Sequence, residues 1–202
     1  MKKFYCLLLC VFLLLLSACS LTETDNSSDA ITGESISDEN SLIAACDYYK
    51  LYANTLSETY EIYNANGELV RTEATDMPLS VTMLNETTVD ISKGKGTGIT
   101  QHTYYSVQKD AFSDDFLYVI CADNDLIAYI GLAEDGSDDK TLIVQNIYDK
   151  SSYCKEFKGV FDQVDTYDLS SVEGEFSNDL SILTVRYYQN EQQYQISKNF
   201  RL

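Results

Sequence analysis

The 202-residue sequence has no tryptophan, one proline and one histidine, and its 14 basic residues face 32 acidic ones. Without tryptophan, the side chain that most often stacks on sugar rings is missing, although 16 tyrosines are present to replace it. The net charge of -18 repels phosphate backbones, so nucleic acid is not an expected partner. It also disfavours a position flat on anionic lipid, where basic residues supply the attraction.

The sequence also lacks an apolar run long enough to span a bilayer, which requires about 20 residues. The longest such run, 6–16, is rich in leucine, valine and phenylalanine, and it follows Lys2 and Lys3. It ends in the small residues Ser17 and Ala18, and polar sequence follows shortly afterwards. A charged start, a short apolar run and small residues predict a secretory signal segment, which takes no part in the fold.

The end of this segment reads Leu16, Ser17, Ala18, Cys19, and it resembles the lipobox of bacterial lipoproteins. The resemblance covers residues 1–19. It implies cleavage before Cys19 and attachment of lipid to that cysteine, with Leu16, Ser17 and Ala18 serving as the recognition sequence. The implied location is the extracytoplasmic face of the cell membrane. The alternative is an ordinary signal peptide with an incidental cysteine.

The rest of the chain divides at residue 41. Residues 20–41 contain six carboxylates, no basic residue and no aromatic residue, and this composition predicts a disordered linker. As a flexible coil it would span about 25 Å. The expected organisation is therefore a signal peptide (1–18), a lipidated cysteine with an acidic linker (19–41), and one folded domain (42–202).

The folded part reads as short strands. Residues 60–63 and 68–73 flank Asn64-Ala65-Asn66-Gly67, and an Asn-Gly pair between alternating runs predicts a hairpin. Residues 42–56 fit a helix or a strand, with a strand preferred, and 111–116 suggest one helical turn. Pro78 opens a strand, where its missing donor does least harm. Further runs rich in Val, Ile, Thr and Tyr predict strands at 79–84, 88–92, 99–107, 117–121, 126–132, 141–148, 154–161, 172–176, 182–188 and 193–200.

These runs predict an all-β domain of antiparallel meander sheets. Similar strands recur about every 40 residues, at 60–63, 103–107, 142–148 and 182–188. The stretch 172–188 resembles a β-propeller blade through Phe176-Ser177-Asn178-Asp179, with Asn178 where proline is usual and Leu180 where glycine is usual. A chain of this length holds at most four such blades, so the expected arrangement is sandwich-like or partial-propeller-like, not a closed ring.

Three cysteines follow Cys19, namely Cys46, Cys121 and Cys154. Their spacings match no metal site and no C-x-x-C motif. They are expected to be buried thiols that act as small hydrophobic side chains. The alternative is one disulfide, for which Cys121 and Cys154 are the preferred pair, because an exported protein can form such bonds.

Candidate chemistry is sparse. His102 is the one histidine, and without a G-x-S-x-G or S-x-x-K motif it is interpreted as a half-exposed strand residue, not a catalytic one. Paired carboxylates for glycoside hydrolysis remain an alternative, because a sequence gives no distance between carboxylates.

Two stretches could bind ions. Lys93-Gly94-Lys95-Gly96 is basic and glycine-rich, so Lys93, Lys95 and Gly96 are candidate anion-binding residues, with a flexible hairpin as the alternative. Asp123 with Asp125, and Asp135 with Asp138, could offer oxygens to calcium, although neither stretch follows the EF-hand order. No other cofactor is expected beyond the covalent lipid.

These observations lead to one hypothesis and two alternatives. The hypothesis is a non-enzymatic β module of the cell envelope, anchored to the membrane by lipid, that binds a protein or a glycan. The alternatives are an envelope hydrolase that uses paired carboxylates and a purely structural lipoprotein. A hydrolase predicts a deep pocket with converging carboxylates, whereas a binding module predicts a flat or shallow tyrosine-rich face.

Overall fold

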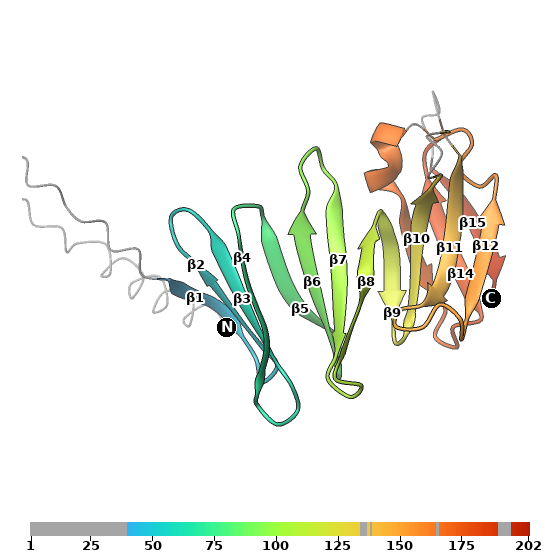
Figure 1. The fold of residues 1–202 in the computed structure, drawn as a ribbon. Helices are drawn as coiled ribbons and strands as arrows, with labels where there is room; N and C mark the ends of the chain where they lie inside the picture. Colours follow the sequence, from blue (N-terminus) through green and yellow to red (C-terminus); the bar gives the residue numbers. More distant parts are fainter. Residues whose placement is uncertain (1–39, 134–136, 138, 165, 190–194) are drawn as a thin grey trace, which may run out of the picture. The chain divides into compact units, whose positions relative to one another are not determined.

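The computed structural model describes residues 40–133, 137, 139–164, 166–189 and 195–202, without the side chains of 166–168. The predicted signal peptide, Cys19 and nearly all of the predicted linker lie outside these residues. The described chain is all-β, as the sequence predicts, and its four antiparallel sheets do not close into a barrel (Figure 1).

Each sheet is a meander of consecutive strands. Sheet A contains β1 (Ser41–Ala45), β2 (Tyr49–Ala53), β3 (Glu58–Tyr63) and β4 (Leu69–Thr75). Sheet B contains β5 (Leu79–Asn85), β6 (Thr88–Gly94), β7 (Thr100–Ser106) and β8 (Ala111–Leu117). Sheet C contains β9 (Val119–Asp123), β10 (Leu126–Leu132), β11 (Lys140–Asn146) and β12 (Cys154–Lys158). After the 3₁₀ helix η1 (Thr166–Ser171), sheet D contains β13 (Glu173–Phe176), β14 (Ile182–Tyr187) and β15 (Ile196–Arg201).

The recurrence of about 40 residues in the sequence corresponds to these sheets. Its four stretches fall on β3, β7 and β11, the third strands of sheets A, B and C, and on β14, the central strand of sheet D. These strands contribute many of the most buried side chains, such as Ile62, Tyr105 and Val185. What repeats is therefore the apolar content of the sequence, because each sheet has one well-buried strand among these four.

The buried side chains form clusters that join each sheet to the next one along the chain. Leu51 and Ile62 of sheet A pack with Val89 and Tyr105 of sheet B. A second cluster joins sheets B and C, and it contains Tyr104, Phe116, Ile127 and Ile147. The third joins sheets C and D, and it contains Ile130, Leu142, Val144, Phe161, Leu183, Val185 and Tyr187. Alternation along each strand supplies one apolar face for each of these contacts.

The predicted Asn-Gly hairpin is confirmed between β3 and β4. Gly67 has a φ of 75°, which glycine adopts without strain. The Asn64 side-chain oxygen accepts hydrogen bonds from the backbone N–H groups of Asn66 (2.9 Å) and Glu68 (3.0 Å). Asn64 is itself buried. This side chain therefore fixes the turn from within.

The blade-like turn at Phe176 connects β13 to β14. The Asp179 carboxylate accepts hydrogen bonds from the Ser177 hydroxyl at 2.7 Å and from the Ser181 hydroxyl at 2.8 Å. These bonds lower the pKa of Asp179 to about 2. Leu180 has a φ of 55° at the position where blades usually have glycine. The Asp179 hydrogen bonds thus stabilise a turn in which leucine, which disfavours a positive φ, takes the place of glycine.

Two local predictions need correction or refinement. The helical turn predicted at 111–116 is wrong, because these residues form β8 and pair with β7. There Phe112 packs on Tyr105 with ring centroids 4.7 Å apart, and pairing with a neighbouring strand outweighs local propensity. Residues 42–56 form two strands, β1 and β2, in agreement with the preferred interpretation.

The cysteines also differ from expectation. Cys46, Cys121 and Cys154 are all free thiols, so the alternative of a bridge between Cys121 and Cys154 is wrong. Cys121 packs against the core between sheets C and D, whereas Cys46 and Cys154 are exposed. The expectation of buried thiols therefore holds in part for Cys121 alone, which is partly buried on β9 against sheet D.

Candidate ligand-binding face

Sheet A has one face in the core and one face that no other sheet of the described chain covers. Cross-strand partners share a face, so Leu42, Tyr52, Thr59 and Ala74 form one row, and Ala45, Lys50, Glu61 and Thr72 form the next. Tyr63 and Leu69 extend the same face. We call these ten residues the outer face of sheet A. None of the core clusters of the described chain includes Lys50, Tyr52 or Tyr63.

Two tyrosines on this face are held by one carboxylate. The Glu61 Oε2 atom accepts hydrogen bonds from the Tyr52 hydroxyl at 3.2 Å and from the Tyr63 hydroxyl at 2.5 Å. The Lys50 ammonium lies 5.0 Å from the centroid of the Tyr63 ring. Desolvation and the Glu61 hydrogen bond raise the pKa of Tyr52, so its hydroxyl stays protonated and donates. The rings are therefore positioned before any ligand arrives.

Exposed aliphatic side chains border these tyrosines. Leu42 is 57% exposed and Leu69 is 52% exposed, at opposite edges of the sheet. Ile43, Leu56 and Val70 are also exposed, and all five lie in or beside the strands of sheet A. Scattered single apolar residues are normal on a surface, whereas Leu42 lies opposite Tyr52 and Leu69 lies opposite Tyr63 on one face, which makes this face a candidate binding surface.

The corresponding face of sheet D has different chemistry. Its rows contain Glu173, Glu175, Thr184, Arg186, Ser197, Asn199 and Arg201, with Ile182, 41% exposed, as their one aliphatic member. Arg186 forms an ion pair with Glu175 there. Terminal units of a stacked array require a polar outer surface for solubility. Sheet D meets that requirement, and the outer face of sheet A does not.

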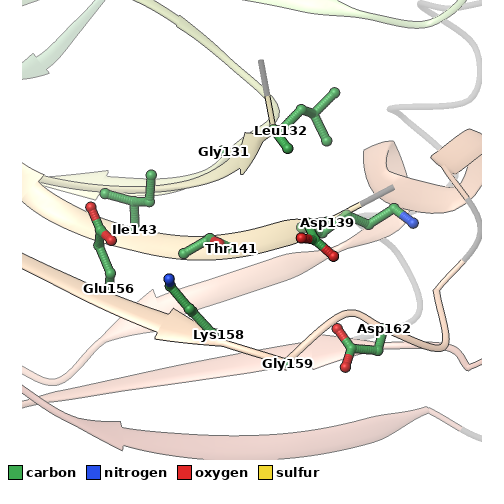
Figure 2. Close-up of a pocket in the computed structure, with 11 residues that line it drawn as sticks. Gly131, Leu132, Asp139, Thr141, Ile143, Glu156, Lys158, Gly159 and Asp162 are labelled. Atoms are coloured by element: carbon green, nitrogen blue, oxygen red, sulfur yellow. The ribbon is translucent and has the colours of Figure 1, made fainter. Parts of the chain in front are cut away.

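A pocket of about 430 Å³ lies along β10, β11 and β12 (Figure 2), and it tests the hydrolase alternative. Asp139, Glu156 and Asp162 line it, but all three are exposed to solvent. Figure 2 shows Asp139 and Asp162 at one end and Glu156 at the other. A general acid that works near neutral pH needs a desolvated carboxyl group, and this pocket provides none among its lining carboxylates.

His102 lies in a cluster that resembles a catalytic triad in composition but not in geometry. Its Nδ1 atom is 3.0 Å from Asp90 Oδ1 and 3.2 Å from Ser92 Oγ. The Ser92 hydroxyl also donates to Asp90 at 3.3 Å. A triad needs the acid on one ring nitrogen and the nucleophile on the other, whereas here both contact Nδ1. His102 is half-buried beside Tyr104, so its interpretation as a strand residue fits this geometry.

The structure describes the candidate anion-binding residues in full. Lys93 forms an ion pair with Glu73 at 2.5 Å, and Gly96 has a φ of 83° in the turn that follows β6. Lys95 is exposed in the same turn. Lys93 and Lys95 line a common cavity with Arg71, a residue that the sequence did not single out.

The structure describes only two of the four candidate calcium ligands. Asp123 and Asp125 flank Asn124 in the turn between β9 and β10, and Asp125 accepts a hydrogen bond from Lys109 at 2.8 Å. Asp135 and Asp138 lie outside the described residues. Where the chain is described, no three acidic, histidine or cysteine side chains gather as metal ligands would.

Sequence reasoning missed Tyr52, Tyr63 and Glu61 as a group. The one available signal was the alternation of 60–63, which shows that Glu61 and Tyr63 share a face. It does not show which face is covered, or that Tyr52 lies across from Thr59 on the same side. The described residues include no helix that is both long enough and apolar enough to cross a membrane. No protein-family model, curated protein or solved structure matches the chain.

Proposed function

We propose that this chain is a lipid-anchored module of the cell envelope that binds a protein ligand with the outer face of sheet A. The observation that carries the proposal is the contrast between the two terminal sheets. Sheet D ends in a polar, ion-paired surface, whereas sheet A exposes positioned tyrosines bordered by leucine. An uncovered aromatic and aliphatic face in a chain of net charge -18 serves binding better than solubility.

The chemistry of the face favours a protein over a glycan. Sugar recognition needs free polar donors beside the aromatic rings, but the hydroxyls of Tyr52 and Tyr63 both donate to Glu61. What remains for a ligand is mainly ring surface together with Leu42 and Leu69, with Lys50, Thr59 and Thr72 as the other polar side chains of the face. Rigid aromatic rings beside aliphatic side chains are the usual energetic centre of protein interfaces.

The lipid anchor is supported by residues 1–19. Two or three acyl chains on Cys19 would suffice for stable attachment, since each buried methylene contributes about 0.8 kcal/mol. The acidic stretch before residue 41 and the negative domain would keep the binding face away from an anionic surface. The Cys19→Ala variant is expected to leave the detergent phase in a partition experiment. Unchanged partitioning of that variant would refute the anchor.

The binding face is tested by comparing two tyrosine variants. Tyr63→Ser removes a ring from the outer face of sheet A, whereas Tyr188→Ser removes one that is 44% exposed just after β14. Each full-length variant is used to capture ligand from envelope extract, with captured material compared by mass. We expect Tyr63→Ser to lose the captured protein and Tyr188→Ser to retain it.

Two treatments of the extract identify the class of ligand. Protease digestion should abolish specific capture, and periodate oxidation of sugars should leave it unchanged. The reverse pattern would show a glycan ligand and refute the preference for protein. Equal capture by Tyr63→Ser and wild type would show that the outer face of sheet A is not the binding surface.

A further inference from the structure

A cavity of about 250 Å³ lies between sheets A and B, on the side of sheet A opposite the outer face. We call it the A–B cavity. Sheet A contributes Tyr60, Arg71 and Glu73 from β3 and β4. Sheet B and the turn after β6 contribute Lys93, Lys95, Gln101, Thr103 and Asp115, with Ile91 as the one aliphatic lining residue. Its lining is therefore almost entirely polar.

The two carboxylates in the A–B cavity already have partners. Glu73 accepts hydrogen bonds from the Lys93 ammonium at 2.5 Å and from the Tyr60 hydroxyl at 2.9 Å. The Lys93 hydrogen bond is the main reason that the pKa of Glu73 is lowered, so this group stays ionised. Asp115 accepts a hydrogen bond from the Thr103 hydroxyl at 2.5 Å. Glu73 is therefore paired with a cation, whereas Asp115 is hydrogen-bonded to a neutral hydroxyl and keeps its negative charge.

Among the described residues, the other two cations of the A–B cavity, Arg71 and Lys95, do not form an ion pair of the kind that Lys93 forms with Glu73. Within the described chain, no carboxylate lies at ion-pair distance from Arg71 or Lys95. The Arg71 guanidinium lies over the Phe112 ring, 3.4 Å from its centroid. Stacking holds the guanidinium plane in place. A hydrogen bond with the Tyr60 hydroxyl uses part of its edge, and the remaining N–H groups can bind a carboxylate.

The charge of the lining limits the ligand. Three cations and two carboxylates give a net charge of about +1, in a chain whose net charge is -18. This balance matches one carboxylate and not a doubly charged phosphate. Gln101, Thr103 and Tyr60 add amide and hydroxyl groups that suit a ligand rich in hydroxyls, and the volume limits that ligand to about one sugar unit.

From these features we propose that the A–B cavity binds a compact, hydroxylated monocarboxylate, such as a sugar acid, with Arg71 and Lys95 on its carboxylate. Gln101 and the hydroxyl-bearing side chains contact the remainder of the ligand. This inference is independent of the proposed protein ligand, because the two surfaces lie on opposite faces of sheet A and their tests use different residues.

The test is calorimetric titration of the full-length chain, in detergent, with D-glucuronate, D-galacturonate and D-gluconate. We expect at least one of them to bind, more weakly as salt is added. D-glucose, which lacks the carboxylate, should give no binding. Absence of binding for all three acids, or equal binding of glucose, would overturn the proposal. Inorganic phosphate that binds as tightly as the acids would overturn the assignment of a single charge.

Two variants locate the site. Lys95→Gln lies in an exposed turn, so the fold should be retained, and the affinity should fall about tenfold because a charged hydrogen bond is lost. Lys155→Gln, at an exposed lysine on β12, is the matched control and should leave affinity unchanged. Equal affinities of the two variants would place the ligand elsewhere. Arg71→Gln should abolish binding, with thermal unfolding measured alongside to confirm that the protein remains folded.

Discussion

Replacing Gly174 by alanine should weaken the packing of sheet D against sheet C. An added Cβ atom would lie 2.5 Å from Ile120 Cγ2, 3.2 Å from the Thr184 carbonyl oxygen and 3.5 Å from Cys121 Sγ. The Ile120 methyl is attached directly to its own Cβ, and the Thr184 carbonyl belongs to a paired strand, so relief requires movement of a strand. Overpacking of this kind costs about 1–3 kcal/mol.

An opposing term comes from the unfolded chain, where alanine is less flexible than glycine and favours folding by about 0.4–1 kcal/mol. The free energy of unfolding should therefore fall by about 1–2 kcal/mol. Urea unfolding followed by circular dichroism measures this loss. With a slope of about 2 kcal/mol per molar urea, the midpoint should fall by roughly 0.5–1 M.

The matched control for this substitution is Gly131→Ala. Its added Cβ would lie 2.6 Å from Ile143 Cδ1, almost the same distance. That atom is the far end of a flexible side chain, and it can rotate away, so the free energy of unfolding should change by less than about 0.5 kcal/mol. Equal midpoints for the two variants would refute the reasoning that an immovable neighbour, and not the distance alone, determines the cost.

Four further predictions concern individual residues. Burial raises the pKa of the Cys121 thiol to about 12, so a thiol reagent at pH 8 should modify exposed Cys46 much faster, and equal rates would contradict this burial. The stability that Cys121 contributes is present below pH 9 and is lost as the pH rises towards 12, so Cys121→Ala should reduce the loss of stability over that range. Asn64→Ala should cost about 1–2 kcal/mol in urea unfolding, because two backbone N–H groups lose their acceptor, and an unchanged midpoint would show that the turn does not need it. The wild type, Ser92→Ala and His102→Ala should all hydrolyse esters at the background rate. A measurable wild-type activity that both substitutions abolish would show that His102 is catalytic.

The all-β fold and its repeat could be predicted because they depend on local sequence. Asn66 and Gly67 specify a turn, and runs in which apolar and polar residues alternate specify strands with one buried face. The error at 111–116 has the opposite cause. Phe112 and Phe116 are placed by contacts with Tyr105 and Tyr129 on other strands, and no short window contains that information.

The candidate site could be predicted only in part, for the same reason. Lys93 and Lys95 stood out because they are closely spaced basic residues in an acidic chain. Arg71 lies near them only because sheets A and B pack together, so that β4 and β6 line the same cavity. Tyr52 and Tyr63 are eleven residues apart, and they share Glu61 through the register of β2 and β3. Register and sheet packing, not residue type, assemble both surfaces.

The difference between the two terminal sheets also constrains self-association. Head-to-tail contact between copies would place the Leu42 and Leu69 surface of one chain on the Arg186 and Glu175 surface of the next, where apolar groups would desolvate charges without replacing their partners. Copies could associate favourably only through like faces, which gives a closed pair and not an open fibre. If the outer face of sheet A binds as proposed, the polar rows of sheet D would therefore oppose open-ended assembly of copies at high local concentration.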